Sequence, residues 1–153
     1  MTVVVRTARS PTDRLAAWKI RAAVFIDEQG IAEAVERDGL DDIAWHFVAW
    51  EGETAVGTAR VIGLDTSDRP VPPAEATAVK IGRMAVLPAK RRLGIGLRLL
   101  DAALELARQN GLRRAELSAQ EYVVGFYEQA GFRVEGDPYV EAGIPHRHMS
   151  RQL

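Results

Sequence analysis

Residues 79–107 constrain the fold of this chain more than any other stretch. The stretch begins with an apolar run suited to a β-strand and ends with leucines that recur at helical spacing. Between the two lies a short basic loop that holds Pro88, Lys90, Arg91 and Arg92, followed by Gly94 and Gly96. The first turn of a helix offers unpaired N–H groups and the positive end of the helix dipole, and glycine lets the backbone approach an anion closely. The pattern therefore predicts a loop that binds phosphate groups.

The spacing of Gly94 and Gly96 fits neither of the two familiar nucleotide loops. A Walker A loop has the pattern GxxxxGK followed by Ser or Thr, and here the two glycines are too close together. The Rossmann pattern GxGxxG needs a third glycine at position 99, which is Leu99. Nucleotide hydrolysis and hydride transfer therefore lose support. Close helix packing is the purely structural explanation of the two glycines.

Composition narrows the class of protein. The 153 residues are expected to form one domain, residues 1–153, which is long enough to bury a core. A net charge of −1 argues against nucleic-acid binding, which needs a broad basic surface. Because there is no cysteine, disulfides and thiolate metal sites are excluded. No stretch has the length and apolarity of a signal peptide or a membrane span, so we expect a cytoplasmic protein that does not bind a membrane.

The periodicity of apolar residues predicts an α/β domain in which strands outnumber helices. Strands are expected over residues 3–7, 45–50, 54–64, 78–87, 115–119, 132–135 and 146–152. Helices are expected from residue 11 to the polar residues 27–30, and over residues 32–37, 91–110 and 122–130. The segments 65–76 and 136–145 are expected to be a long surface loop and a region of turns. An early hairpin favours a mixed sheet over a wholly parallel one.

Two of these helices have a predicted buried face. The first begins with Ser10 as its N-terminal cap and Pro11 in its first turn. Its apolar stripe consists of Leu15, Trp18, Ala22 and Phe25. The stripe of the helix over residues 91–110 consists of Leu93, Leu97, Leu100, Leu104 and Ala107, and Gly111 is expected to end that helix.

An acidic segment follows the first helix, over residues 31–42. Its last part, residues 38–42, has the sequence DGLDD and is predicted to be a loop. One interpretation is a solvated surface loop, and the other is an acidic rim that attracts a cationic substrate. The sequence does not separate the two.

Two motifs resemble the signatures of the GNAT superfamily of N-acetyltransferases. Residues 82–88, GRMAVLP, followed by RRLGIG at 91–96, resemble the superfamily's acyl-CoA-binding motif. Residues 126–132, FYEQAGF, resemble its second signature, and a helix and a strand separate the two motifs as in the family. Further segments are similar to the ElaA/YjcF-type branch, namely residues 24–29, 57–60, 119–120 and 141–146. The resemblance implies a GNAT-like fold with a mixed, mostly antiparallel central sheet of six to seven strands flanked by about four helices.

The resemblance also implies an acetyl-CoA-dependent N-acetyltransferase that acts on a primary amine of a small molecule or peptide by direct attack. The backbone of Met84, Ala85 and Val86 would bind the pantetheine arm and polarise the thioester carbonyl. Gln120 stands where many family members carry an asparagine that contacts this arm. The pyrophosphate would be held by the N–H groups of Arg91, Arg92, Leu93, Gly94, Ile95, Gly96 and Leu97, with Lys90, Arg91 or Arg92 adding charge at its edge.

By the same resemblance, Tyr127 would donate a proton to the departing sulfur, because a phenol with a pKa of about 10 is protonated at neutral pH. A tyrosine in the core of an apolar helix face is the structural alternative. The base that takes the proton of the amine is open. The candidates are Glu28 and His46, and also Glu141 and His146. His46 is equally suited to a structural hydrogen bond.

No metal is expected, because His146 and His148 share one strand face without a third ligand. A non-catalytic module that binds or senses acyl-CoA is the alternative to an enzyme, and a purely structural domain is a third hypothesis. Trp45, Trp50 and the acidic loop point to a small amine or polyamine as acceptor. Strands at a sheet edge often pair between subunits, so a homodimer is a further hypothesis.

Overall fold

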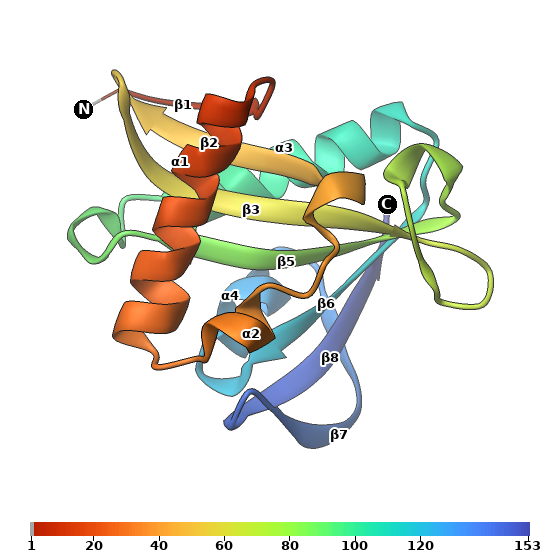
Figure 1. Ribbon diagram of the computed structural model, residues 1–153. Coiled ribbons are helices and arrows are strands. Elements are labelled where there is room, and N and C mark those ends of the chain that lie inside the picture. Colours follow the sequence, from red (N-terminus) through yellow and green to blue (C-terminus); the bar gives the residue numbers. More distant parts are fainter. Residues whose placement is uncertain (1) are drawn as a thin grey trace.

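The computed structural model describes residues 2–153. Its strands form one eight-stranded sheet in the order β1-β2-β3-β5-β6-β8-β7, with β4 paired to β3 (Figure 1). The strands are β1 Val3–Thr7, β2 Trp45–Glu51, β3 Thr54–Leu64, β4 Pro70–Val71, β5 Ala78–Val86, β6 Arg114–Gln120, β7 Arg133–Glu141 and β8 Ile144–Gln152. Only β5 and β6 run parallel, and every other neighbouring pair is antiparallel. The predicted mixed, mostly antiparallel α/β architecture is confirmed.

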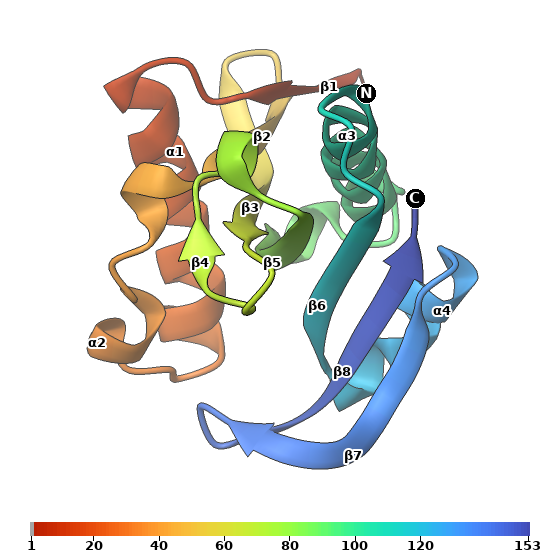
Figure 2. The same ribbon diagram turned by 90° about the vertical axis from the view of Figure 1, so that its right-hand side faces the viewer.

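The helices cover both faces of the sheet. They are α1 Pro11–Arg21, which continues into the π-helix η1 Ala22–Glu28, then α2 Glu33–Glu36, α3 Ile95–Gln109 and α4 Val124–Gln129. Short 3₁₀ turns are η2 Asp41–Ile43, η3 Pro73–Glu75, η4 Pro88–Lys90 and η5 Glu121–Val123. Figure 2 shows α1 and α2 on one side of the sheet and α3 and α4 on the other. No helix within residues 2–153 is long and apolar enough to cross a membrane.

The first helix begins as predicted, but its buried face is rotated. Ser10 Oγ accepts a hydrogen bond from the Asp13 N–H at 3.1 Å. Leu15, expected in the core, is 50% exposed. The residues that are buried on this helix and its π-helical extension are Ala17, Ile20, Arg21, Val24 and Phe25. The prediction was wrong in phase because the centre of the buried face is an arginine, which a search for apolar residues does not count.

The third helix starts at Ile95 rather than at residue 91. Arg92 and Gly94 have positive φ angles of 64° and 81°, which are incompatible with a right-handed helix. Leu93 therefore lies before the helix and is 55% exposed, while Leu97 lies on the outer side of the helix and is 45% exposed. The buried residues of the helix are Ile95, Leu99, Leu100, Ala103, Leu104 and Ala107. They pack on the face of the sheet opposite α1.

The parallel strands β5 and β6 separate after a short paired segment. Their pairing covers Val79 with Ala115, Lys80 with Glu116 and Ile81 with Leu117. Beyond Ile81, β5 continues to Val86 and β6 continues to Gln120. Arg83 has a φ of 49°, and the register between β3 and β5 shifts at this point, so β5 contains a bulge. The sheet therefore opens into a wedge between the ends of β5 and β6, which the views of Figures 1 and 2 both show.

The C-terminal region is more regular than predicted. The segment expected to consist of turns is largely strand, because β7 runs to Glu141 and turns tightly at Ala142 and Gly143 into β8. The register of β7 shifts between Glu135 and Tyr139, so that Gly136 and Pro138 lie at an irregularity of an edge strand. Glycine and proline are tolerated at such positions and do not end the strand.

Candidate functional site

The loop before α3 has the backbone geometry of an anion-binding site. Its positive φ angles at Arg92 and Gly94 alternate with ordinary ones, an arrangement that turns successive N–H groups toward one side. The first helical hydrogen bond of this turn runs from the Arg98 N–H to the Gly94 carbonyl at 3.1 Å. The N–H groups of Ile95, Gly96 and Leu97 precede that bond, as expected at a helix start. Together they can hold a phosphate at the positive end of a fifteen-residue helix.

The two glycines of the loop have different roles. Gly94 adopts a left-handed conformation that other residues rarely tolerate. Gly96 has an ordinary helical conformation, and a Cβ atom there would meet the ring of Phe126 at 3.5 Å, an ordinary contact. Only Gly94 is therefore demanded by the backbone.

Glu28 and Arg91 form a bidentate ion pair with N–O distances of 2.6 and 2.7 Å. The Arg91 Nε–H also donates to the Val86 carbonyl at 2.9 Å, so this side chain ties the loop to the end of β5. The hydrogen bond from Arg91 lowers the pKa of Glu28. A carboxylate held in this way is a poorer base, so the geometry does not favour Glu28 as the group that deprotonates an amine.

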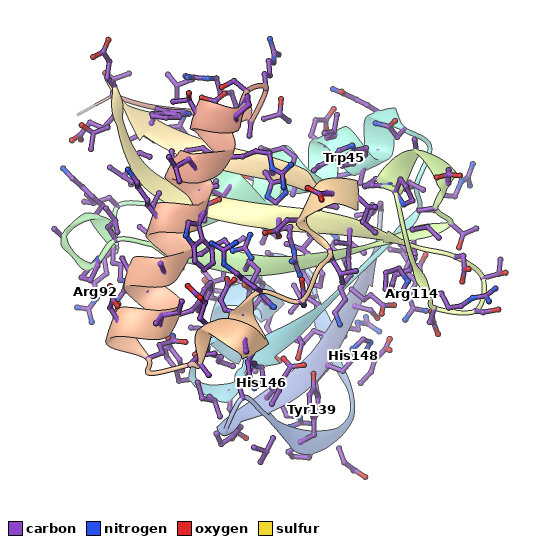
Figure 3. The ribbon with its side chains drawn as sticks, in the orientation of Figure 1. Trp45, Arg92, Arg114, Tyr139, His146 and His148 are labelled. Atoms are coloured by element: carbon purple, nitrogen blue, oxygen red, sulfur yellow. The ribbon has the colours of Figure 1, made fainter. Side chains whose placement is uncertain are left out.

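The other basic residues of the loop point elsewhere. Lys90 pairs with Glu51 of β2 at 2.9 Å and holds the loop against the hairpin. Arg92 is exposed and projects from the loop at the edge of the molecule (Figure 3). Of the three cations, Arg92 is thus the one whose side chain extends into solvent beside the loop.

The wedge leaves one edge of β5 open. Ala85 and Val86 pair with Thr58 and Gly57 of β3, whereas on the other side the pairing with β6 ends at Ile81. Backbone groups on this free edge can pair with the amides of an extended ligand, as an added strand does. An arm bound there would run from the phosphate loop toward the bulge at Arg83.

Tyr127, on α4, reaches the same wedge from the α3 side. Its hydroxyl lies 3.7 Å from the sulfur of Met84. Its ring packs edge-on against Phe126 and Phe132, with centroid distances of 5.0 and 6.0 Å. Burial raises the pKa of Tyr127 to about 12, so the phenol keeps its proton at neutral pH. The ring thus belongs to the core, and the hydroxyl lies beside Met84 of β5.

Gln120 and Gln29 connect the two sides of the opening. Gln120, at the end of β6, donates to Gln29 Oε1 at 2.8 Å, and Gln29 donates back at 3.3 Å. Gln29 follows η1, so this amide pair joins the helix on one side of the wedge to the strand on the other. Sequence reasoning missed Gln29, because its partner lies 91 residues away.

The acidic segment after α1 is held in place by ion pairs, so its carboxylates do not form a free acidic rim. Its acids pair with arginines from three other elements. Arg21 of α1 pairs with Glu36 at 2.7 Å and with Asp41 at 2.9 Å. Arg60 of β3 pairs with Asp38 at 2.7 Å and with Asp41 at 3.0 Å. Arg83 of β5 pairs with Glu36 at 3.3 Å and with Asp38 at 3.2 Å. Neither interpretation included these ion pairs, because no local pattern reveals that Arg21 and Arg60, which are buried, and the partly exposed Arg83 pair with these carboxylates.

His46 is part of the same buried region. Its Nε2–H donates to the Asp41 carbonyl at 2.8 Å, and burial lowers the pKa of the imidazole. Strand β3 lies between its strand, β2, and the wedge. The position fits a structural histidine, and the geometry does not favour His46 as the base.

The remaining two candidates, Glu141 and His146, lie together at the open end of β6, β7 and β8. His146 Nε2 is 3.7 Å from Glu141 Oε2, and its Nδ1–H donates to the Ile144 carbonyl at 2.7 Å. Tyr139 stacks on the imidazole with a centroid distance of 6.0 Å, and Ser118 hydrogen-bonds both Tyr139 and Glu141. Figure 3 shows His146 and Tyr139 side by side. Sequence reasoning missed Ser118 and Tyr139, although strand alternation from Gln120 pointed to Ser118.

No three His, Asp or Glu side chains among the described residues are grouped as ligands for a metal ion.

Comparisons with known proteins agree with this geometry. The profile of the acetyltransferase (GNAT) domain family matches residues 13–153. Relatives include the uncharacterised N-acetyltransferase YjcF of Bacillus subtilis, 31% identical over 88% of this chain and 89% of that protein. Protein ElaA of Escherichia coli is 30% identical, and the match covers 88% of this chain and 84% of that protein.

Solved structures give the same result. The crystal structure of E. coli ElaA superposes with a TM-score of 0.82 and 27% identity, covering 98% of this chain and 99% of that one. An acyl-CoA N-acyltransferase from Pseudomonas aeruginosa superposes with a TM-score of 0.79 and 28% identity, covering 98% of each chain.

Proposed function

The chain belongs to the GNAT acetyltransferase family, and from this premise we propose that it transfers an acetyl group from acetyl-CoA to a primary amine of a small molecule or peptide. The observation that carries the proposal is the wedge between β5 and β6. An anion-binding loop lies at one end of the wedge, an open strand edge runs along it, and the Tyr127 hydroxyl reaches into it. These features match a long ligand with a pyrophosphate at one end and a thioester at the other.

The loop supports binding of the pyrophosphate through the N–H groups of Ile95, Gly96 and Leu97. The free edge of Met84, Ala85 and Val86 supplies backbone groups for the pantetheine amides and for the thioester carbonyl. Arg91, bonded to the Val86 carbonyl, holds the loop and the strand at a fixed distance.

The CoA thioester supplies an activated acetyl group when it is bound. The amine forms the new N–C bond as the C–S bond breaks, so one proton leaves the amine and one proton is needed at sulfur. Tyr127 is the proposed donor to sulfur, since its raised pKa keeps it protonated and its hydroxyl lies beside Met84. Protonation makes the sulfur a better leaving group, because it departs as a neutral thiol.

Thiol release from acetyl-CoA in the presence of a panel of primary amines tests the proposal. Turnover with at least one amine is the expected result. Tight binding of acetyl-CoA without turnover on any amine would instead support the alternative, a non-catalytic acyl-CoA-binding or sensing module.

A thermal-shift titration with acetyl-CoA separates both from a purely structural domain. A ligand that binds only the folded protein raises the melting temperature, by a stabilisation of about 2.7 kcal/mol at one hundred times its Kd. An unchanged melting temperature at millimolar acetyl-CoA would rule out the enzyme and the binding module together.

A further inference from the structure

The polar residues at the open end of β6 and β8 share one face of the sheet. On β6, Ala115, Leu117 and Ala119 pack into the core under α3, so Ser118 and Gln120 point to the α1 and α2 side. His146 lies directly opposite Gln120, and Tyr139 lies directly opposite His146. Figure 2 shows the turn between β7 and β8 extending to the side of the sheet on which α1 and α2 lie. Tyr127, by contrast, approaches the wedge from the α3 side.

The hydrogen bond of His146 fixes which nitrogen is basic. Its Nδ1 lies 2.7 Å from the Ile144 carbonyl, and a carbonyl can only accept, so Nδ1 carries the proton of the neutral ring. Nε2 is therefore the proton acceptor. It lies 3.7 Å from Glu141 Oε2, too far for a direct hydrogen bond. The two acceptors face a common point where one N–H-bearing cation can contact both.

Two hydroxyl groups hold Glu141 in this position. Ser118 Oγ is hydrogen-bonded to the Tyr139 hydroxyl and lies 3.4 Å from Glu141 Oε2. Burial raises the pKa of Tyr139, and the charge of Glu141 adds to this rise. Tyr139 therefore stays a donor, and a chain of hydrogen bonds runs from Tyr139 through Ser118 to the carboxylate. The Glu141 side chain is 53% exposed, so a substrate can reach it from solvent.

We propose that Ser118, Tyr139, Glu141 and His146 form the site that binds the acceptor as a primary ammonium ion and takes its proton. The proposal rests on the acetyl transfer proposed above. Glu141 binds the ammonium, and His146 Nε2 accepts one proton from it, which leaves a neutral amine. The amine nitrogen then forms its bond to the acetyl carbon, the C–S bond breaks, and Tyr127 protonates the sulfur. The second proton lost by the nitrogen passes to solvent, and a proton from solvent restores the Tyr127 phenol. The imidazolium is stabilised by Glu141 until it too releases its proton to solvent.

The charged groups closest to His146 and to His148 are different. Among residues 2–153, the charged group within ion-pair distance of the His146 ring is Glu141 of β7. Its Oε2 lies 3.7 Å from His146 Nε2. The cross-strand neighbour of His146 on β6, Gln120, is neutral and is occupied by Gln29 of the segment after η1. His148, one pleat further along β8, instead faces Glu116 at 4.0 Å and Glu135 at 3.8 Å.

The test compares His146→Gln with His148→Gln over a range of pH. A primary amine has a pKa of about 10.4, so a base is needed at pH 7 and hardly needed at pH 10. With spermidine and Nα-acetyl-lysine as probe acceptors, His146→Gln should lower kcat/KM about 10²- to 10³-fold at pH 7 and less than about tenfold at pH 10. His148→Gln should follow the wild type at every pH.

The result that would overturn the amine site is a loss in His146→Gln that is equal at all pH values, or no loss at all, while the wild type turns over. If the wild type itself binds acetyl-CoA but acetylates no amine, the proposed function fails as well, and the two failures are thereby distinguished. The acetyl-CoA thermal shift of each variant verifies that it is folded.

Glu141→Gln provides a second test that does not depend on a buried residue. Because Glu141 is exposed, this variant should fold normally. It should raise KM for the cationic acceptor about tenfold and leave KM for acetyl-CoA unchanged, since only a charge-assisted contact to the ammonium is lost. Unchanged KM for both substrates would contradict the role given to Glu141.

Discussion

The Tyr127 hydroxyl lies 3.7 Å from the sulfur of Met84 at the wedge, while its ring packs among Phe126 and Phe132. Replacing Tyr127 by Phe keeps the ring packing and removes the proposed proton donor. We expect kcat to fall on the order of 10²-fold, with the acetyl-CoA thermal shift retained. Full activity in the variant would remove Tyr127 from the mechanism.

The ionisation of Tyr127 also sets an upper limit on pH for the proposed proton transfer. Because burial raises the pKa of Tyr127 to about 12, the donor form persists well above neutral pH. Ionisation of this phenol should therefore not reduce activity below about pH 11, one unit under that value.

Gly94 is the residue of the phosphate loop that the backbone demands, because its φ is 81°. A Cβ atom added to Gly94 would meet no other atom within 4 Å, so Gly94→Ala adds only backbone strain, roughly 1–2 kcal/mol. The variant should weaken acetyl-CoA binding by distorting the N–H groups beside it. Gly111→Ala is the matched control, because Gly111 has a similar φ of 76° at the far end of α3. Calorimetric titration should show weaker binding in the first variant alone; equal binding in both would mean that the loop conformation does not matter.

At the scale of the element, α2 and the loop after it are fixed by buried ion pairs. Glu36 is 1% exposed and bonds Arg21 through two oxygens at 2.7 Å each. Glu36→Gln leaves the charge of the buried Arg21 only partly neutralised. It should lower the free energy of unfolding, measured with urea, by about 3–5 kcal/mol. Asp42→Asn, which breaks a pair whose acid is 91% exposed, should cost less than about 1 kcal/mol. Similar losses in the two variants would contradict the anchoring of α2 by this pair.

Asp38 makes the anchoring of this segment dependent on pH. Burial alone would raise the pKa of Asp38, but the hydrogen bond and charge of Arg60, with the charge of Arg83, lower it to about 2. Since an unfolded Asp has a pKa of about 3.9, the stabilisation is complete above that pH and is lost as the pH falls through 2. The difference in Tm between the wild type and Asp38→Asn should therefore be constant from pH 7 to 5 and shrink below pH 4.

Asp101→Asn, on the exposed side of α3, is the control for that series and should follow the wild type at each pH. A difference in Tm between the wild type and Asp38→Asn that persists unchanged at pH 2 would contradict the ion pairing of Asp38 with Arg60 and Arg83.

At the scale of the whole molecule, the wedge is the place that side chains from both faces of the sheet can reach. The proposed donor site opens between β5 and β6, the proposed acid reaches it from the α3 side, and the proposed amine site lies on the α1 and α2 side. The proposed acid and the proposed base thus lie on opposite faces of the sheet. The sheet ends in β1 on one side and β7 on the other, and the homodimer expected from edge pairing stays a prediction.

Hydrogen exchange can test the wedge in the intact protein. Acetyl-CoA should slow exchange of the backbone N–H groups of residues 84 and 86, on the free edge of β5, and of residues 95–97, at the start of α3. The hairpin of β2 and β3, already paired on both sides, should change little. Protection spread evenly over all strands would instead indicate global stabilisation without binding in the wedge.

The sequence by itself determined the features that depend on neighbouring residues. The hairpin of β2 and β3, the end of α3 at Gly111 and the basic loop before α3 were predicted correctly, because glycine conformations and apolar spacing act locally. The order of the two motifs, residues 82–96 and 126–132, also identified the family. Errors of phase, such as Leu15 and Leu93 outside the core, arose where a charged residue or a left-handed turn displaced the helix face.

Only the tertiary structure decided which distant residues meet. The pairs Arg21 with Glu36, Arg60 with Asp38 and Gln29 with Gln120 join elements far apart in the chain, as does the group around His146. Strand alternation tells which face a side chain points to, but not which strand lies beside it or where two strands separate. The acceptor site depends on those choices, since packing of the whole sheet sets them and no local pattern does.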